Sequence, residues 1–374
     1  MEALDTLVSV DVDLATAAFQ TATFSTILFL YTSTVAAETS PQLVSSPTEM
    51  AAVTSLTQDA RPTEYNAVSV LFGQNPGPNK IIVCPVTAFS ADALNAQLPA
   101  INALGGFYGV LSVAALADQQ TIATWAQANK KLFVAMDNTG TGGATTTTDL
   151  AAYFQTNDMD HCAAICAPSA ASYPTYLADF AWMAKAFSYA AGSENWSNMQ
   201  LTGVLAENLT TEQRANILAK NGNTFEPYGN DGTTPLSLTF KGTVGTGNYI
   251  DEIRGRDALC NSIKTAVANV LIQRPKVPYT DGGISAVKGA ILATLENYMR
   301  IGFLDQPSTN SDGTVNPSYT VTVPQRKDIA TSQIQARDLS GITFTARLAS
   351  AIDTVNGDGS GSYGIVGTLV YSMS

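Results

Sequence analysis

Three side chains that commonly bind metals or act as nucleophiles lie in one short segment of the chain. His161, the only histidine, is followed by Cys162 and Cys166. Imidazole and thiolate groups are the usual ligands of zinc, and a histidine beside a nucleophile is central to many hydrolases. The segment has the apolar composition of a strand, which would put the two cysteines on one face and the histidine on the other. No fourth ligand is near in the sequence, so we expect these three residues to have packing roles.

Two glycine-rich segments resemble ligand-binding loops but lack the decisive residues. Residues 140–143 read Gly-Thr-Gly-Gly, without the Lys-Ser/Thr pair that a phosphate loop requires. Residues 356–361 imitate the first half of a calcium loop, but its twelfth position is Gly367 instead of a bidentate glutamate. We therefore predict that the protein is not an enzyme and that it holds no metal and no cofactor.

The composition indicates a surface that is poor in charge. The chain has 374 residues, of which 45% are hydrophobic and 13% charged, whereas about 25% charged residues is usual for globular proteins. Uncharged polar groups cost less to desolvate than ions, so such a surface suits extensive protein contact. The net charge of −12 argues against nucleic-acid binding, which needs a basic surface.

The charge is unevenly distributed along the chain. Residues 251–374 carry 11 basic and 11 acidic side chains, and the first 250 residues carry 8 and 20. We expect the C-terminal part to face an acidic partner and the acidic part to face solvent.

The cysteines and the N-terminal residues favour a reducing compartment. Cys84, Cys162, Cys166 and Cys260 all lie in apolar segments. The first residues, MEALDTLVSV, are acidic and lack the basic region of a secretory signal, so we expect a cytosolic product with reduced thiols. The apolar stretch from Thr26 to Tyr31 is too short to span a bilayer, and we predict no membrane association.

The periodicity of apolar residues predicts two kinds of structure. Short apolar strands alternate with helices over roughly 75–200, which is typical of a parallel α/β domain. Two long helices follow at 249–274, with an interruption at Gly255, and at 281–301; strands are predicted at 319–323 and 342–348. We predict an N-terminal arm with strands over 1–35, an α/β domain over 36–200, and a C-terminal domain over 201–374.

Both ends of the chain have the alternation of half-buried strands. At the N-terminus the apolar positions are Val8, Val10, Val12 and Leu14; at the C-terminus, in an arm over 361–374, they include Ile365, Leu369 and Tyr371. A strand at a chain end pairs either with the chain's own sheet or with the open sheet edge of another chain. The sequence leaves both pairings open.

Several segments, taken in order, resemble the contractile-tail sheath proteins of myophages, in particular a short sheath-like family first described as a phage family of unknown function (DUF3383). The segments are 207–213, 218–225, 249–257, 276–284 and 319–324, together with the opening strand. The resemblance implies an α/β and α+β protein: a central parallel α/β domain, subtilisin-like by fold only, and an α+β sheath core built from the N- and C-terminal parts, with extended terminal arms.

The same resemblance implies a structural role. Subunits would form stacked hexameric rings around a tail tube, linked by strand exchange, and would contract to drive the tube through the host envelope during genome ejection. The implied partners are further copies of the chain, the tube protein, and the baseplate and tail terminator proteins. The implied place is the virion tail, after assembly in the bacterial cytoplasm. Together with the uneven charge, the resemblance implies that the 201–374 domain is the inner one, nearest the tube, and that the 36–200 domain is the outer one. The candidate tube-facing residues are Arg254, Arg256, Lys264, Arg274 and Lys276. The alternatives are a static tail-tube or other virion protein and an α/β enzyme.

Overall fold

The computed structural model describes residues 24–138, 143–168, 177–228, 236–354 and 368–372. The described chain divides into two compact units. The first ends at Arg254 and the second begins at Gly255. Each unit is described by itself below.

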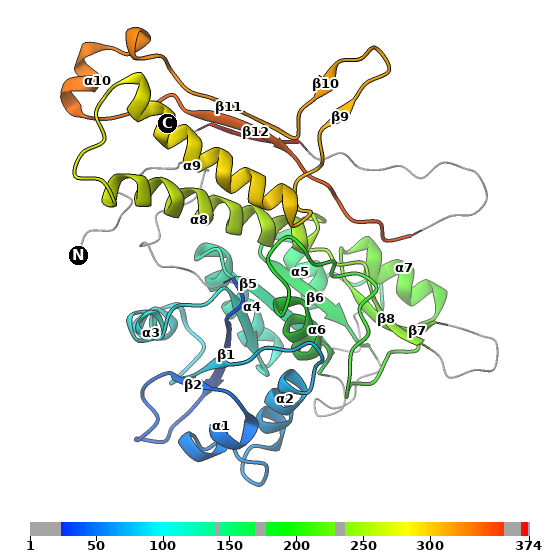
Figure 1. Cartoon of the computed structure of the whole chain (residues 1–374). Helices are drawn as coiled ribbons and strands as arrows, with labels where there is room; N and C mark the ends of the chain where they lie inside the picture. Colours follow the sequence, from blue (N-terminus) through cyan, green and yellow to red (C-terminus); the bar gives the residue numbers. More distant parts are fainter. Residues whose placement is uncertain (1–23, 139–142, 169–176, 229–235, 355–367, 373–374) are drawn as a thin grey trace. The chain divides into compact units, whose positions relative to one another are not determined.

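The first unit is built on a six-stranded sheet with the order β2-β3-β1-β4-β5-β6 (Figure 1). All neighbouring strands are parallel except β2, which pairs antiparallel with β3 at one end of the sheet. The predicted parallel α/β architecture is therefore confirmed. The strands are β1 (Ile27–Thr32), β2 (Gln42–Val44), β3 (Ile81–Val86), β4 (Gly109–Ser112), β5 (Leu132–Asp137) and β6 (Cys162–Cys166).

The strand β1 lies inside this sheet, between β3 and β4. Leu28 is paired with Ile82 on one side and with Val110 on the other. Residues 27–31 are all buried. A strand that is apolar at every position needs cover on both faces, and a central strand of a parallel sheet has it. The assignment of residues up to 35 to the sheath core is thus corrected for β1, which belongs to the α/β unit.

Helices cover both faces of the sheet. The helices α1 (Pro47–Val53), α2 (Pro62–Phe72) and α6 (Ala178–Phe187) contribute to one buried cluster with Phe29 and Tyr31. The helices α3 (Ala91–Ala103), α4 (Leu116–Ala128) and α5 (Leu150–Thr156) contribute to the other, with Leu28 and Leu30. The alternate side chains of β1 thus enter two separate cores, as the pleat of a strand requires.

The first unit also includes a helix and a hairpin that the sequence analysis assigned to the C-terminal domain. The helix α7 (Thr211–Ala219) starts with a capping box between Thr210 and Gln213. It is followed by the antiparallel pair β7 (Thr224–Tyr228) and β8 (Leu236–Phe240). Ile217 and Phe225 are buried in the two cores of the sheet. The domain boundary expected near 201 therefore lies at 254 instead, because these side chains complete the core of the α/β unit.

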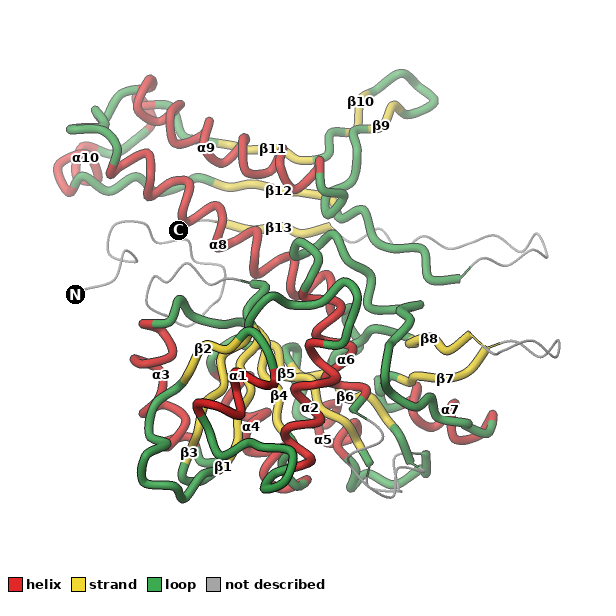
Figure 2. Tube along the Cα trace, turned by 60° about the horizontal axis from the view of Figure 1, so that its bottom comes forward, coloured by secondary structure: helices red, strands yellow, loops and turns green. Residues whose placement is uncertain are grey.

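The second unit combines two long helices with a small antiparallel sheet (Figure 2). The helix α8 (Ile250–Ile272) begins in the last residues of the first unit and is followed by α9 (Asp281–Arg300). The sheet has the order β11-β12-β13. Its strands are β11 (Tyr319–Thr322), β12 (Thr343–Arg347) and β13 (Thr368–Ser372); a short hairpin, β9 (Ser308–Thr309) and β10 (Val315–Asn316), and the helix α10 (Thr331–Ala336) complete the unit.

The helix α8 continues through Gly255, where the sequence predicted an interruption. A Cβ atom at this position would lie 2.2 Å from Cε2 of Phe303. The glycine therefore makes room for an aromatic ring that packs directly on the helix backbone. In α9, Ile284, Val287, Ile291 and Leu295 are all buried and form one apolar face.

Candidate functional site

The histidine and cysteines that suggested metal or acid–base chemistry have packing roles in the structure. The His161 side chain is buried, and its Nδ1 lies 2.6 Å from Oδ1 of Asp160. Burial raises the pKa of the Cys162 and Cys166 thiols well above the ordinary value, so neither is a ready thiolate ligand. Among the described residues, no group of three or more His, Cys, Asp or Glu side chains is placed to hold a metal ion.

The other two cysteines are equally shielded. Cys84 and Cys260 are buried like the pair on β6. Burial raises the pKa of Cys84 to about 12. The side chains thus behave as small apolar residues of the cores.

The glycine-rich segments fall largely outside the described residues. This holds for 139–142 and for 355–367, which contain most of the phosphate-loop and calcium-loop candidates. Gly143 is described: its carbonyl oxygen accepts a hydrogen bond from Nδ2 of Asn216, 3.1 Å away. A Cβ atom at Gly143 would lie 2.8 Å from Cγ of Gln213, so this end of the segment packs against α7.

The terminal strands are described only at the C-terminal end. Val8, Val10, Val12, Leu14 and Ile365 lie outside the described residues. Leu369 and Tyr371 belong to β13, whose backbone pairs antiparallel with β12 of the same chain. The register places Leu369 opposite Ala346 and Tyr371 opposite Phe344. This pairing is the within-chain alternative that the sequence left open.

The three-stranded sheet has one covered face and two outer strands. Val321, Phe344 and Ala346 are buried on the covered face. In the part of the chain that is described, β11 and β13 each have a strand neighbour on one side only. Unpaired backbone N–H and C=O groups along such edges can accept a further strand. The sheet is therefore the best candidate for a subunit-linking site.

Arg254, which was expected to face a tube, is an internal residue. Its side chain is fully buried and lies 2.5 Å from Glu194, measured between Nη1 and Oε1. Its guanidinium also donates to the carbonyl oxygens of Phe24, Ala186 and Tyr189 and lies over the ring of Phe187. All of its hydrogen-bonding capacity is used inside the first unit. The assignment of Arg254 to a contact surface is therefore wrong.

The other four candidate cations differ in their exposure. Arg256 is partly exposed and lies 3.3 Å from the carboxylate of Asp257, and Lys264 is half-buried. Arg274 and Lys276 are exposed in the connection between α8 and α9. Only these last two have the full accessibility that a contact surface needs.

Two further exposed cations, Lys327 and Arg337, lie near this connection, and the sequence analysis missed them. Nε of Arg326 donates to the carbonyl oxygen of Tyr279 at 3.1 Å, and the Tyr279 hydroxyl donates to the carbonyl oxygen of Asp338 at 2.7 Å. These bonds hold the segment around α10 against the α8–α9 connection. Lys327 and Arg337 are exposed in that segment. They follow Arg274 by more than 50 positions, so no local sequence signal links them.

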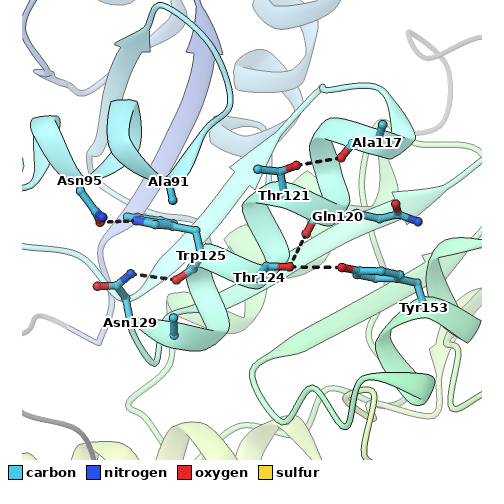
Figure 3. Close-up of a pocket in the computed structure, with 10 residues that line it drawn as sticks. Ala91, Asn95, Ala117, Gln120, Thr121, Thr124, Trp125, Asn129 and Tyr153 are labelled. Atoms are coloured by element: carbon cyan, nitrogen blue, oxygen red, sulfur yellow. Dashed lines mark hydrogen bonds between the residues drawn. The ribbon is translucent and has the colours of Figure 1, made fainter.

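A shallow pocket of about 430 Å³ lies over α3, α4 and α5 (Figure 3). Its polar side chains are neutral and bond mainly to one another or to the backbone. Trp125 Nε1 donates to Asn95 Oδ1 at 2.8 Å, and the Thr124 and Tyr153 hydroxyls are 3.2 Å apart. The lining contains no carboxylate, histidine, cysteine or lysine. Its groups thus serve to join the helices.

None of the helices in the described part of the chain combines the length and apolar character that crossing a bilayer requires.

Comparisons with known proteins found likeness at the level of structure. No protein-family model matches the sequence, and a search of curated proteins found no match; the narrower DUF3383 resemblance is thus without support from a family model. A chain from the baseplate of the anti-feeding prophage (AFP) matches with a TM-score of 0.62 and 14% identity, over 95% of this chain and 99% of that chain.

Two sheath structures match similarly. The AFP helical sheath in its contracted state gives a TM-score of 0.62 at 16% identity, over 91% of this chain and 93% of that chain. The contracted PVC sheath complex of an extracellular contractile injection system gives 0.61 at 13% identity, over 92% and 93%. The fold of this chain is therefore the fold of contractile injection system sheath proteins.

Proposed function

We propose that this chain is the structural sheath subunit of a contractile phage tail. The observation that carries the proposal is the extent of the structural likeness: it covers 91% of this chain and 93% of the AFP helical sheath chain. A parallel α/β layer alone is shared by many unrelated proteins. A match over both the α/β unit and the second unit is far more specific than that.

In this proposal, subunits form stacked hexameric rings and exchange their terminal strands. The support is the five-residue register between β12 and β13. Because β13 is joined to the rest of its chain through 355–367, the same strand from a neighbouring copy can make the same backbone hydrogen bonds on β12. Each such bond stabilises by about 0.5–1.5 kcal/mol net, so one exchanged strand gives a link of several kcal/mol. The N-terminal strand of Val8, Val10, Val12 and Leu14 would add a second link.

We further propose that the second unit faces the tail tube and that the 36–200 region faces outward. Of the five cations considered for this face, the exposed Arg274 and Lys276 are the tube-facing candidates that we keep; Arg256 and Lys264 are partly buried, and Arg254 is internal. Exposed ion pairs contribute about 0–1 kcal/mol each, which suits contacts that must release together during contraction. The other partners would be the baseplate and tail terminator proteins, in a virion tail that is assembled in the host cytoplasm and later drives genome ejection.

Negative-stain microscopy of the purified full-length protein tests the proposal directly. We expect hollow tubes or stacked rings at high protein concentration. Discrete particles under all conditions of salt and concentration would contradict the sheath function and favour the enzyme alternative. The orientation has a separate test: cross-linking within intact tails should join the tube to residues after 254, and cross-links mainly to 80–190 would overturn it.

A further inference from the structure

A hairpin in the second unit extends into solvent without support from the rest of its unit. Every residue of 306–317, which includes β9 and β10, is exposed. Figures 1 and 2 both show the hairpin pointing away from α8 and α9. Val315, on β10, has 67% of its surface exposed. Within its own chain the hairpin therefore buries very little apolar surface.

The turn of this hairpin is nevertheless held in one conformation by its own hydrogen bonds. Asn310 and Thr314 are joined through the Asn310 N–H and the Thr314 carbonyl oxygen, 2.8 Å apart, and again through their side chains at 2.9 Å. The Thr314 N–H and hydroxyl both donate to Oδ1 of Asp312, at 2.9 and 2.6 Å. Gly313 takes the positive φ of 82° that the turn requires. A loop ordered in this way loses little entropy when it docks.

The hairpin carries a single charge. Asp312 is the only charged residue of 306–317. Hydrogen bonds from Thr314 lower the pKa of its carboxyl group, so it is an anion at neutral pH. The hairpin thus offers one anion, fixed at the turn, together with one exposed valine on the adjoining strand.

The opposite end of the same unit is basic. Figures 1 and 2 place the hairpin beyond one end of α9 and the α8–α9 connection with α10 at the other end. The 20 residues of α9 separate these ends by about 30 Å. We call Arg274, Lys276, Lys327 and Arg337 the basic end. All four are exposed, and none forms an ion pair with any described residue. Three acidic residues, Asp281, Asp328 and Asp338, also lie here. The cations of this region, which also include Arg326, still outnumber these acids.

We propose that the 306–317 hairpin of one copy docks on the basic end of a second copy at Lys327 and Arg337, which leaves Arg274 and Lys276 for the tube. This inference rests on the proposed function, in which copies of the chain polymerise. Because the two surfaces lie at opposite ends of one unit, the contact is head-to-tail, and such contacts generate rings or helical stacks instead of closed pairs. A hairpin covers less area than a standard interface. It therefore supplements the strand links and determines which end of one copy meets which end of the next.

A charge exchange tests this contact in the full-length protein. Asp312→Lys and the pair Lys327→Glu with Arg337→Glu should each raise the concentration needed for polymerisation about five- to tenfold at low salt. Combining all three changes should restore most of the loss. Asp312→Asn removes the charge but keeps a side-chain oxygen that can accept hydrogen bonds from Thr314. A loss of polymerisation in this variant is therefore due to the charge and not to the shape of the turn. Asp59→Lys, an exposed site in the other unit, is the matched control for net charge.

Cross-linking gives an independent readout. The four native cysteines are buried, so Asp312→Cys and Arg337→Cys in separate full-length proteins present one exposed thiol each. A short bis-maleimide should link a mixture of the two variants far more than either alone, and a mixture of Asp59→Cys with Arg337→Cys should stay unlinked. If wild type polymerises and the Asp312 variants polymerise equally well, the hairpin contact is refuted while the sheath function stands. If wild type never polymerises, both are refuted.

Discussion

Arg254 and Glu194 form an ion pair in which both side chains are completely buried, with 2.5 Å between Nη1 and Oε1. Arg254 is the last residue of the first unit and, as the fifth residue of α8, lies in the second turn of that helix. Its bonds to the carbonyl oxygens of Phe24 and Tyr189 tie this turn to the segment before β1 and to the chain after α6. The pair therefore fixes the start of the helix that leads into the second unit.

Replacing Arg254 with alanine should destabilise the first unit strongly. The change leaves the Glu194 carboxylate buried without its cation, and breaking a buried pair in this way costs about 3–5 kcal/mol. Urea unfolding followed by circular dichroism measures the loss. Arg274→Ala, at an exposed site, should change the free energy of unfolding by less than about 0.5 kcal/mol. Equal stabilities of the two variants would show that the pair contributes nothing.

Arg254 also illustrates what the sequence could not predict. The uneven charge of the chain and the resemblance to sheath proteins suggested a contact surface for it. The partner that makes it internal, Glu194, is 60 residues away, and a local charge pattern carries no information on such a pair. The interruption predicted at Gly255 was wrong for a related reason. Glycine disfavours helices on local grounds, but this glycine makes room for the ring of Phe303, which becomes its neighbour only through packing.

Elements that depend on local signals were predictable. The helices predicted at 249–274 and 281–301 and the strands predicted at 319–323 and 342–348 rest on the periodicity of neighbouring residues, and the structure has them as α8, α9, β11 and β12. The hairpin of β9 and β10 was missed because its strands are two residues each and fully exposed. The partner of β13 could not be decided from the sequence, because its alternation of apolar residues fits a strand in the sheet of its own chain and equally a strand added to the sheet of a neighbouring chain.

Asp179 should make stability depend on pH. Its carboxyl group is fully buried, and burial raises its pKa from 3.8 to about 7, against the smaller lowering effect of the backbone groups of Met136, Asp179 and Phe180. The folded state then binds this proton more tightly than the unfolded state, so stability falls as pH rises from about 4 to 7. The full effect is about 4 kcal/mol. Asp179→Asn should flatten the decline and exceed wild type at pH 8.

The measurement is urea unfolding at pH 5, 6, 7 and 8. Asp59→Asn, at an exposed site, should follow the wild-type pH profile. A shift of the Asp179→Asn curve by the same amount at every pH would mean that the carboxyl group does not titrate differently on folding.

Two glycines in the helices of the second unit should respond oppositely to alanine. At Gly255 the new methyl group would lie 2.2 Å from the Phe303 ring, whereas at Gly289, in α9, no atom lies within 4 Å. Gly255→Ala should cost about 1–3 kcal/mol through overpacking. Gly289→Ala should stabilise by about 0.5–1 kcal/mol through helix propensity. Thermal unfolding distinguishes the two, and a stabilised Gly255→Ala would contradict the packing described here.

Removal of the C-terminal strand should block assembly and leave the first unit intact. A protein without 365–374 loses β13, whereas the α/β unit contains none of these residues. We expect a folded, soluble monomer by circular dichroism and sedimentation. Normal tubes from the truncated protein would contradict strand exchange.

A disulfide across the register shows which chain provides β13. Thr345 lies opposite Val370, so Thr345→Cys combined with Val370→Cys can be oxidised. If neighbours exchange the strand, oxidised polymers should give a ladder of covalently joined chains in denaturing gels. If the disulfides form only within single chains, in tubes that are otherwise normal, β13 pairs with β12 of its own chain and is not exchanged.

Contraction should need neither nucleotide nor metal. If the extended lattice is a kinetic trap and the contracted one buries more surface between subunits, the energy is stored at assembly. Moving a two-state population from 1:99 to 99:1 takes only about 5.5 kcal/mol in total, and many weak contacts in a cooperative lattice can supply it. Brief heating or mild denaturant should therefore shorten isolated tails in the presence of a chelator. A requirement for ATP, or a block by chelator that maps to this chain, would instead support the enzyme alternative, because a lattice that releases stored energy has no use for either.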